Sequence, residues 1–308
     1  MSKRILVTGG AGFIGSHLAR HFAEHSEVTV LDDLRSGYAH NLEGVRCRFL
    51  QGSILDAAGL KQAIAGAEEV YHLAAMISVP ESVAKPDECA ELNTEGTRRV
   101  LAAALAAGAR KVVLASSAAI YGDNPMVPKL ESMSPEPKSP YAETKLAGEH
   151  LLEEYRQAHG LSSTSLRFFN VFGPRQDPRS AYAAAVPIFI AKALRDEPIG
   201  LHGDGGQTRD FIHVTDIVGA LAFAGASKEM AGTYNVGYGR SQSILALAQE
   251  IIRLTGSKSP IEYLPPRAGD VRHSLASTER LLAAGWKPRS SVSAGLAETV
   301  EYFRQIKG

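Results

Sequence analysis

Short apolar runs rich in Val, Ile and Leu alternate with longer stretches of helical spacing through the first half of the chain. The apolar runs, which predict strands, cover 5–7, 28–31, 46–51, 69–73, 111–114 and 163–168. The intervening stretches, which predict helices, cover 14–25, 60–65, 87–107 and 141–159. Short apolar runs without alternation are typical of strands buried on both faces of a parallel sheet. This order predicts βαβ crossovers and an α/β fold, a Rossmann-type doubly wound parallel sheet.

The pattern changes after about residue 172. Gly, Pro and Arg become frequent, and the helical stretches are shorter, over 186–195, 214–226, 244–254 and 294–305. We therefore predict a large domain over 1–172 and a smaller mixed α/β lobe over 173–308, some segments of which return to the large domain. The Pro-rich segment 122–139 is expected to be a surface loop. His213 is expected to be structural and to precede a helix that Thr215 or Asp216 caps.

A glycine-rich segment, 8–15, follows the first predicted strand and opens the first predicted helix. Its glycines suit the binding of a dinucleotide: Gly9 permits a tight turn, Gly12 lets the backbone approach a pyrophosphate, and Gly15 lets the helix pack closely on the strand. The helix N-terminus offers free N–H groups to the phosphates. The alternative interpretation is a structural turn alone.

Two acids at the end of the second predicted strand support the dinucleotide interpretation. Asp32 and Asp33 lie about 20 residues after the glycines, where a carboxylate accepts hydrogen bonds from the adenosine ribose. A carboxylate there repels the 2′-phosphate of NADP, so NAD is the expected cofactor, although Arg35 nearby softens this preference.

Hydroxyl and amine side chains follow in a pattern that suits proton transfer. Ser116 and Ser117 end a predicted strand and should face the cofactor, while Tyr141 and Lys145 share one face of a helix. A free tyrosine has a pKa near 10 and is a poor base, but a neighbouring ammonium stabilises the phenolate and is expected to lower that pKa. Without the glycine segment, a Tyr-x-x-x-Lys pair would be an ordinary amphipathic pair.

Composition narrows the class of protein. Lys+Arg and Asp+Glu both total 33 of 308 residues, so the zero net charge favours neither nucleic acid nor an acidic membrane as a partner. Two cysteines, Cys47 and Cys89, lack metal-type spacing and indicate a reducing compartment, and no metal site is expected. The first apolar segment is broken by Gly9-Gly10, so we expect neither a signal peptide nor a membrane span and a cytoplasmic location.

These motifs resemble the extended short-chain dehydrogenase/reductase family, and within it the UDP-hexose 4-epimerases. The resemblance covers nearly the whole chain. Segments 8–15, 115–122 and 141–145 match the family in general, and 167–176, 207–213 and 267–270 match the epimerase branch. It implies an NAD-dependent isomerase acting on a UDP-sugar.

The resemblance also implies roles for individual residues. Ser117, Tyr141 and Lys145 would be catalytic. The implied cofactor contacts are Gly9, Gly12, Phe13, Ile14, Asp32, Asp33, Ser36, Gly37, Ser53, Ile54, Leu73, Ala74, Ala75, Asn93, Ser116, Tyr141, Lys145 and Phe168. The implied substrate contacts are Ser117, Tyr141, Asn170, Ala185, Val186, Leu201, His202, Arg209, Arg267, Asp270 and Ser274. Arginines suit a diphosphate because the guanidinium fork pairs with phosphate oxygens.

Two positions bear on the reaction and the sugar. Ala118 and Ala119 follow Ser117 where related dehydratases and decarboxylases carry acids, so return of the hydride, an epimerisation, is favoured. Ser274 lies where the family walls the sugar pocket, and a small side chain there would admit an N-acetyl group. UDP-GlcNAc and UDP-GalNAc are therefore expected substrates, beside or instead of UDP-glucose and UDP-galactose.

Other functions remain open at this point. Arg175 or Arg179 could hold a uronate carboxylate, which would suit a UDP-glucuronate 4-epimerase. A non-catalytic NAD-binding sensor is an alternative of another class, but it would have no use for Ser117, Tyr141 and Lys145 together. By the resemblance, a homodimer through 87–107 and 141–159 is expected, although their apolar faces could equally be core.

Overall fold

The computed structural model describes residues 2–178, 184–266 and 271–306. Its strands are β1 (Lys3–Thr8), β2 (Ser26–Asp32), β3 (Cys47–Gln51), β4 (Glu69–His72), β5 (Lys111–Ser117), β6 (Ser163–Phe168), β7 (Asn170–Phe172), β8 (Ile199–His202), β9 (Thr208–His213), β10 (Gly232–Val236), β11 (Ser241–Ser243) and β12 (Ile261–Leu264). Its α-helices are α1 (Phe13–Ala23), α2 (Ala57–Ile64), α3 (Val79–Ala84), α4 (Pro86–Ala90), α5 (Gly96–Ala106), α6 (Pro140–His159), α7 (Ala185–Ala193), α8 (Val214–Ala226), α9 (Ile244–Thr255), α10 (Glu279–Ala283) and α11 (Val292–Gln305).

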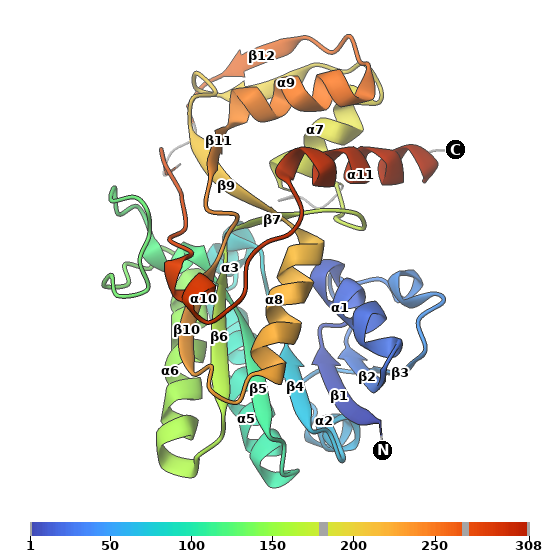
Figure 1. The fold of residues 1–308 in the computed structure, drawn as a ribbon, viewed down its shortest axis with the longest axis vertical. Helices are drawn as coiled ribbons and strands as arrows, with labels where there is room; N and C mark the ends of the chain where they lie inside the picture. The colour runs from blue at the N-terminus through green and yellow to red at the C-terminus, as the bar shows by residue number, and fades with distance from the viewer. Residues whose placement is uncertain (1, 179–183, 267–270, 307–308) are drawn as a thin grey trace.

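A seven-stranded parallel sheet forms the large body of the molecule, in the order β10-β6-β5-β4-β1-β2-β3 (Figure 1). The order runs one way from β1 through β2 to β3 and the other way from β4 onward. The order of the strands therefore reverses between β1 and β4, at a topological switch point. In open parallel sheets, ligands bind at such a point, beyond the carboxyl ends of the strands. The expected Rossmann-type doubly wound fold is confirmed.

Alternating side chains of the buried strands reach two different cores. Ile5 and Val7 of β1 pack with α1 and α8, whereas Leu6 between them packs with α2, α5 and α6. Successive residues of a strand point to opposite faces, so an all-apolar strand must be covered on both sides. Figure 1 shows α1 and α8 on the near face of the sheet.

A smaller lobe lies beyond the carboxyl end of the sheet (Figure 1). It contains a three-stranded sheet, β11-β9-β7, a two-stranded parallel sheet of β8 and β12, and the helices α7, α9 and α11. Three segments of the second half, α8, β10 and α10, belong instead to the large body, where β10 extends the sheet beside β6. None of the helices in the described ranges is long and apolar enough to cross a membrane.

Two predicted helices differ in detail from the structure. The stretch predicted as one helix over 87–107 is α4, a π-helical turn at Glu91–Glu95, and α5. The prediction that Thr215 or Asp216 caps the N-terminus of the helix that ends at Ala226 is wrong. This helix, α8, begins at Val214, and His213 occupies the N-cap position. The Thr215 hydroxyl hydrogen bonds with the His213 ring, and the Asp216 carboxylate accepts hydrogen bonds from N–H groups of a distant loop.

Candidate active site

A cleft of about 710 Å³ lies at the switch point of the sheet, between the large body and the segment 175–177. Its floor is the turn between β1 and α1, its sides come from the ends of β2, β4 and β5, and Tyr141 and Lys145 reach it from α6. The cleft is large enough for a dinucleotide, since ligand pockets commonly measure about 300–1,000 Å³.

The glycine turn fits a dinucleotide sterically. Gly9 has a φ of +71°, and a Cβ there would lie 2.6 Å from the backbone nitrogen of Ala74. A Cβ on Gly15 would lie 2.1 Å from the carbonyl oxygen of Gly9, so α1 packs on the turn as closely as only glycine permits. Gly12 precedes the first turn of α1 and lines the cleft, where the unpaired N–H groups of the helix attract phosphate.

Asp32 is fixed at the end of β2 beside this turn. Its carboxylate accepts hydrogen bonds from the N–H groups of Ala11 (2.9 Å) and Leu34 (2.8 Å). Burial raises the pKa of Asp32, and these N–H groups act in the opposite direction. The carboxylate also lines the cleft, so it can accept further hydrogen bonds from ribose hydroxyls.

Most of the predicted cofactor contacts lie along this one cleft. Those that line it are Gly9, Gly12, Phe13, Ile14, Asp32, Asp33, Ser36, Ser53, Ile54, Leu73, Ala74, Ala75, Ser116, Tyr141, Lys145 and Phe168. Gly37 does not line it but packs against the backbone of Ala11 and Gly12. Asn93 also lies behind the cleft wall, where its amide hydrogen bonds with the N–H and carbonyl of Met76.

The three predicted catalytic residues meet where β5 ends and α6 begins. Ser139 caps α6 by accepting a hydrogen bond from the Ala142 N–H, and Pro140 occupies the first turn, so Tyr141 is held at the helix entrance. Lys145, one turn later, donates from Nζ to the Ala115 carbonyl (2.9 Å). Its Nζ lies 5.8 Å from the centroid of the Tyr141 ring. The end of β5 therefore contains Ser117 and also binds Lys145 through the Ala115 carbonyl.

The expected lowering of the Tyr141 pKa does not appear in this structure. Burial raises the pKa of the phenol, and a hydrogen bond with Ser117 only partly opposes it. Burial also lowers the pKa of Lys145 to about 8, while Cys89 and Glu149 raise it. The Lys145 ammonium donates to the Ala115 carbonyl instead of to the phenol oxygen. Its charge therefore lowers the Tyr141 pKa by less than burial raises it.

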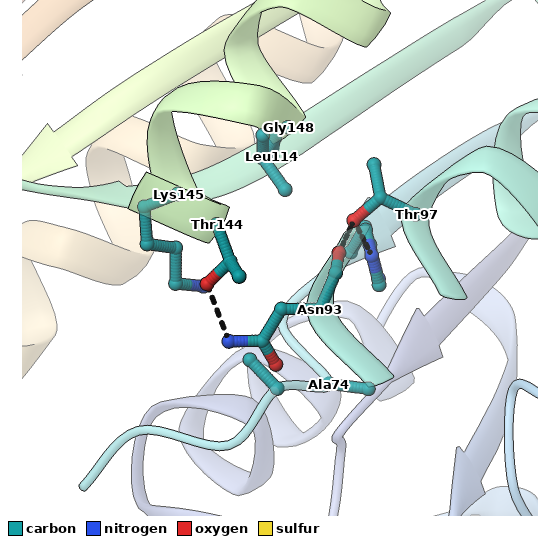
Figure 2. Close-up of a pocket in the computed structure, with 9 residues that line it drawn as sticks. Ala74, Asn93, Thr97, Leu114, Thr144, Lys145 and Gly148 are labelled. Atoms are coloured by element: carbon teal, nitrogen blue, oxygen red, sulfur yellow. Dashed lines mark hydrogen bonds between the residues drawn. The ribbon is translucent and has the colours of Figure 1, made fainter. Parts of the chain in front are cut away.

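A small polar pocket lies beneath Lys145 (Figure 2). The Asn93 side chain from the π-helical turn donates to the Thr144 hydroxyl (3.0 Å), and the Thr97 hydroxyl donates to the Asn93 carbonyl (2.5 Å). The ring of His72 bridges the hydroxyls of Thr97 and Thr8 (3.0 and 2.8 Å). Burial lowers the pKa of His72 to about 3, so the network under the lysine is uncharged at neutral pH.

Predicted substrate residues of the smaller lobe gather around β7 and β9. The Asn170 side chain on β7 donates to the Asp210 carbonyl (3.2 Å), and Arg209 lies next to Asp210 on β9. Ser274 pairs with the start of the same strand, because its N–H donates to the Thr208 carbonyl (3.1 Å). These residues from three distant segments are therefore brought to one strand.

The remaining predicted substrate residues differ in accessibility. Val186 and Leu201 are each 1% exposed and pack in the core of the lobe, so any ligand contact there would use their backbone. Ala185 and His202 are more accessible, and the His202 ring hydrogen bonds with the Pro265 carbonyl. Arg267 and Asp270, and Arg179 from the uronate alternative, lie outside the described residues.

The structure also pairs residues of the cleft in ways that the sequence did not indicate. Arg35 forms ion pairs with Glu81 (3.0 Å) and Glu88 (2.5 Å), and the Tyr38 hydroxyl donates to Asp177 (2.5 Å). Arg35, Tyr38, Glu81 and Asp177 all line the cleft, so the segment after β2 is tied to both of its sides. No local sequence signal predicts such pairs, because their partners lie 46 to 139 positions apart.

The fold and the cleft together define an NAD-binding enzyme of the Rossmann type. Residues 5–237 match the model of the NAD dependent epimerase/dehydratase family, and the chain belongs to that family. Its cofactor is NAD. The resemblance to the extended short-chain dehydrogenase/reductases and their UDP-hexose 4-epimerase branch is confirmed.

Individual relatives match over almost their whole length. A UDP-glucose 4-epimerase from Mycolicibacterium smegmatis is 41% identical, with 98% of each chain aligned. The structure of a UDP-N-acetylglucosamine 4-epimerase from Methanobrevibacter ruminantium, in complex with UDP-N-acetylmuramic acid, superposes with a TM-score of 0.96 at 38% identity and covers 99% of each chain. A UDP-glucose 4-epimerase from Thermotoga maritima, with UDP-glucose, gives a TM-score of 0.95 at 38% identity and covers 99% of this chain and all of that one.

Proposed function

We propose that this protein is a UDP-sugar 4-epimerase that interconverts UDP-GlcNAc and UDP-GalNAc, UDP-glucose and UDP-galactose, or both pairs. The observation that carries the proposal is the meeting of Ser117, Tyr141 and Lys145 at the edge of a cleft that fits NAD. Similarity to epimerases of both sugar types supports the same reaction class.

The residues supply binding and proton transfer. Bound NAD would supply a reversible acceptor for the hydride of the sugar C4. Tyr141 takes the proton of the 4-hydroxyl and later gives it back, and the Ser117 hydroxyl holds the reacting oxygen. Lys145 supplies the positive charge that favours the phenolate and holds the nicotinamide ribose. Arg209 and Asn170 would hold the diphosphate end while the sugar presents its other face.

The residues after Ser117 favour epimerisation over elimination or decarboxylation. Ala118 and Ala119 form a short 3-10 turn, and the Ser117 hydroxyl accepts a hydrogen bond from the Ala119 N–H (3.1 Å). No acid stands there to drive elimination or decarboxylation. A UDP-glucuronate 4-epimerase is the second candidate, because Arg175 lines the cleft with its backbone in the left-handed region (φ +66°).

The deciding experiment uses purified protein with no added cofactor. UDP-GlcNAc, UDP-galactose and UDP-glucuronate are incubated separately, and the C4 epimers are followed by NMR. We expect interconversion of one or both hexose pairs, since a cofactor that is not consumed stays bound through turnover. Turnover of UDP-glucuronate alone would select the second candidate, and no turnover of any of the three, even with NAD, would overturn the proposal in favour of an NAD-binding sensor.

We also propose a cytoplasmic homodimer, with the contact on the α4–α5 and α6 side of the sheet. The apolar residues of these helices that suggested this contact, such as Leu101 and Leu151, are buried against the sheet, so the exposed faces would have to form it. Light scattering coupled to gel filtration gives the mass in solution. A monomer at micromolar concentration would rule the dimer out.

A further inference from the structure

A buried acid, Glu149, lies one helical turn beyond Lys145 on α6. Tyr141, Lys145 and Glu149 are spaced four apart, so all three lie on the same face of the helix. The Glu149 side chain is only 5% exposed. Burying a carboxylate costs free energy unless donors pair with it, so a buried glutamate at this position must have hydrogen-bond partners.

Hydrogen-bond donors surround the Glu149 carboxylate. Arg167 on β6 donates from Nε (2.9 Å) and Nη2 (2.7 Å), and the Ser116 hydroxyl on β5 donates over 2.5 Å. The Arg167 guanidinium in turn stacks on the ring of Tyr121, 4.8 Å from its centroid. The Thr233 hydroxyl of β10 adds a longer hydrogen bond (3.5 Å), so the carboxylate is fixed in place and linked to three strands of the sheet.

The contact with Ser116 connects Glu149 to the catalytic residues. Three consecutive residues at the end of β5 face three groups of α6: the Ala115 carbonyl binds Lys145, Ser116 binds Glu149, and Ser117 hydrogen bonds with Tyr141. A shift of β5 along α6 would break all three contacts together. Glu149 thus holds the strand end in the register that aligns the other two pairs.

Charge provides a second connection. Lys145 is buried among Tyr141 and Glu149 of its own helix, Cys89 of α4 and His72 of β4. Burial lowers the pKa of Lys145, and Glu149 raises it, whereas His72 is neutral at pH 7. A charge of −1 one turn away therefore favours the protonated lysine.

We propose that Glu149 is a positioning residue of the active site, which fixes the end of β5 through Ser116 and places its carboxylate one helical turn from Lys145. This inference rests on the proposed function only for what Lys145 then does. The placement of Glu149 and its effect on the lysine are properties of the chain itself.

The direct test is the titration of Lys145, followed by NMR of lysine labelled with ¹³C at Cε, with a Lys145→Arg variant to assign the signal. We compare the wild type with Glu149→Gln and with Glu153→Gln, a matched control one turn further along α6 whose side chain is 40% exposed. The Lys145 midpoint should fall by about one pH unit in Glu149→Gln, the size of shift that a neighbouring opposite charge produces. It should stay unchanged in Glu153→Gln.

Activity gives the second readout. The alkaline limb of the kcat profile should move to lower pH by the same amount in Glu149→Gln only. Ser116→Ala keeps the charge and should lower kcat without moving the limb. If Glu149→Gln does not fold, the double variant Glu149→Gln/Arg167→Met removes the buried pair together and should still show the lower Lys145 midpoint.

Two results would overturn the inference: a Lys145 midpoint in folded Glu149→Gln that equals the wild-type value, or a Ser116→Ala variant with wild-type kcat. Failure of the proposed function looks different. In that case the wild type would not turn over UDP-sugars, while the NMR titration would still distinguish Glu149→Gln from Glu153→Gln.

Discussion

At the scale of single residues, the proposed chemistry depends on a phenol that burial disfavours as a base. The pKa of Tyr141 is raised where a base would need it lowered. Lys145 reaches the same cleft, but its ammonium binds the Ala115 carbonyl. We therefore expect Tyr141 to work as a base only when Lys145 and a bound, oxidised cofactor would both favour the phenolate.

Replacing the phenol tests this directly. Tyr141→Phe should lower kcat by about 10²–10⁴-fold, the usual contribution of a positioned acid or base, and should leave NAD bound. The measurement is the rate of C4 epimer formation together with the NAD content of the purified protein. Tyr155→Phe makes the same change about four turns further along α6, away from the cleft, and should keep full activity. Full activity in Tyr141→Phe would contradict the scheme.

A second residue bears on the choice of sugar. Ser274 pairs with Thr208, one residue before Arg209, so its side chain lies beside the strand that we propose binds the substrate. Ser274→Tyr should reduce kcat/KM for UDP-GlcNAc by about tenfold or more and spare UDP-galactose, because a bulky ring removes space for the acetyl group. The measurement compares the two substrates for each variant. Ser241→Tyr, on the edge strand β11, is the control. An equal loss of kcat/KM for both substrates in Ser274→Tyr would contradict this role of Ser274.

At the scale of elements, the turn between β1 and α1, which we propose binds the cofactor, is closely packed. Its helix starts so near the strand that the space beside Gly15 is filled by the Gly9 carbonyl. Segment 33–41 then folds over the turn, with the Tyr38 N–H and the Asn41 amide both donating to the Ala11 carbonyl. The geometry of this turn is thus set mainly by contacts of its backbone, which substitutions of side chains elsewhere cannot replace.

Gly15→Ala should therefore lower stability by about 1–3 kcal/mol, as overpacked cores do, and weaken NAD binding because α1 must move. Urea unfolding and NAD titration measure the two effects. Gly219→Ala is a matched change inside α8, where the nearest atom to a new Cβ is Trp286 Nε1 at 3.4 Å. This control should be neutral or slightly stabilising, since alanine favours a helix. Unchanged NAD affinity in Gly15→Ala would contradict the close-packing argument.

At the scale of the whole molecule, the sequence predicted the parts of the fold that local patterns determine. The strands ending at Thr8 and Asp32 and the helix over 214–226 were visible as apolar runs and helical spacing. The strand β10 was not, because it joins the sheet beside β6 only after the long intervening segment 169–231. Pairings of that kind depend on packing between distant segments rather than on any local preference.

The same limit applies to the candidate site. Glycines and the Tyr141–Lys145 spacing carry a chemical meaning in the sequence itself, so they could be found there. Glu149 and Tyr38 could not, because their roles depend on partners in other elements, Ser116 and Asp177. The direction of the Tyr141 pKa was also missed, since burial is a property of the folded molecule.

Buried histidines predict how the stability of the whole molecule responds to acid. Burial lowers the pKa of His72 to about 3 and that of His17 to about 4, from 6.5 when unfolded. Below pH 6.5 the unfolded chain therefore binds protons that the native state does not, and stability falls with the pH. Asp210 opposes this, because burial raises its pKa from 3.8 to about 6 and the native state holds that extra proton.

Together, His17, His72 and Asp210 contribute a slope of about one proton between pH 4 and 6, or about 1.4 kcal/mol per pH unit. His17→Gln keeps a donor for the Pro174 carbonyl, to which the His17 ring bonds over 2.9 Å, and should remove about that much of the slope. Urea unfolding at several pH values, with equal NAD content, measures it. His25→Gln, at an 83% exposed side chain, should leave the slope as it is, and an unchanged slope in His17→Gln would mean that this ring is protonated in the native state.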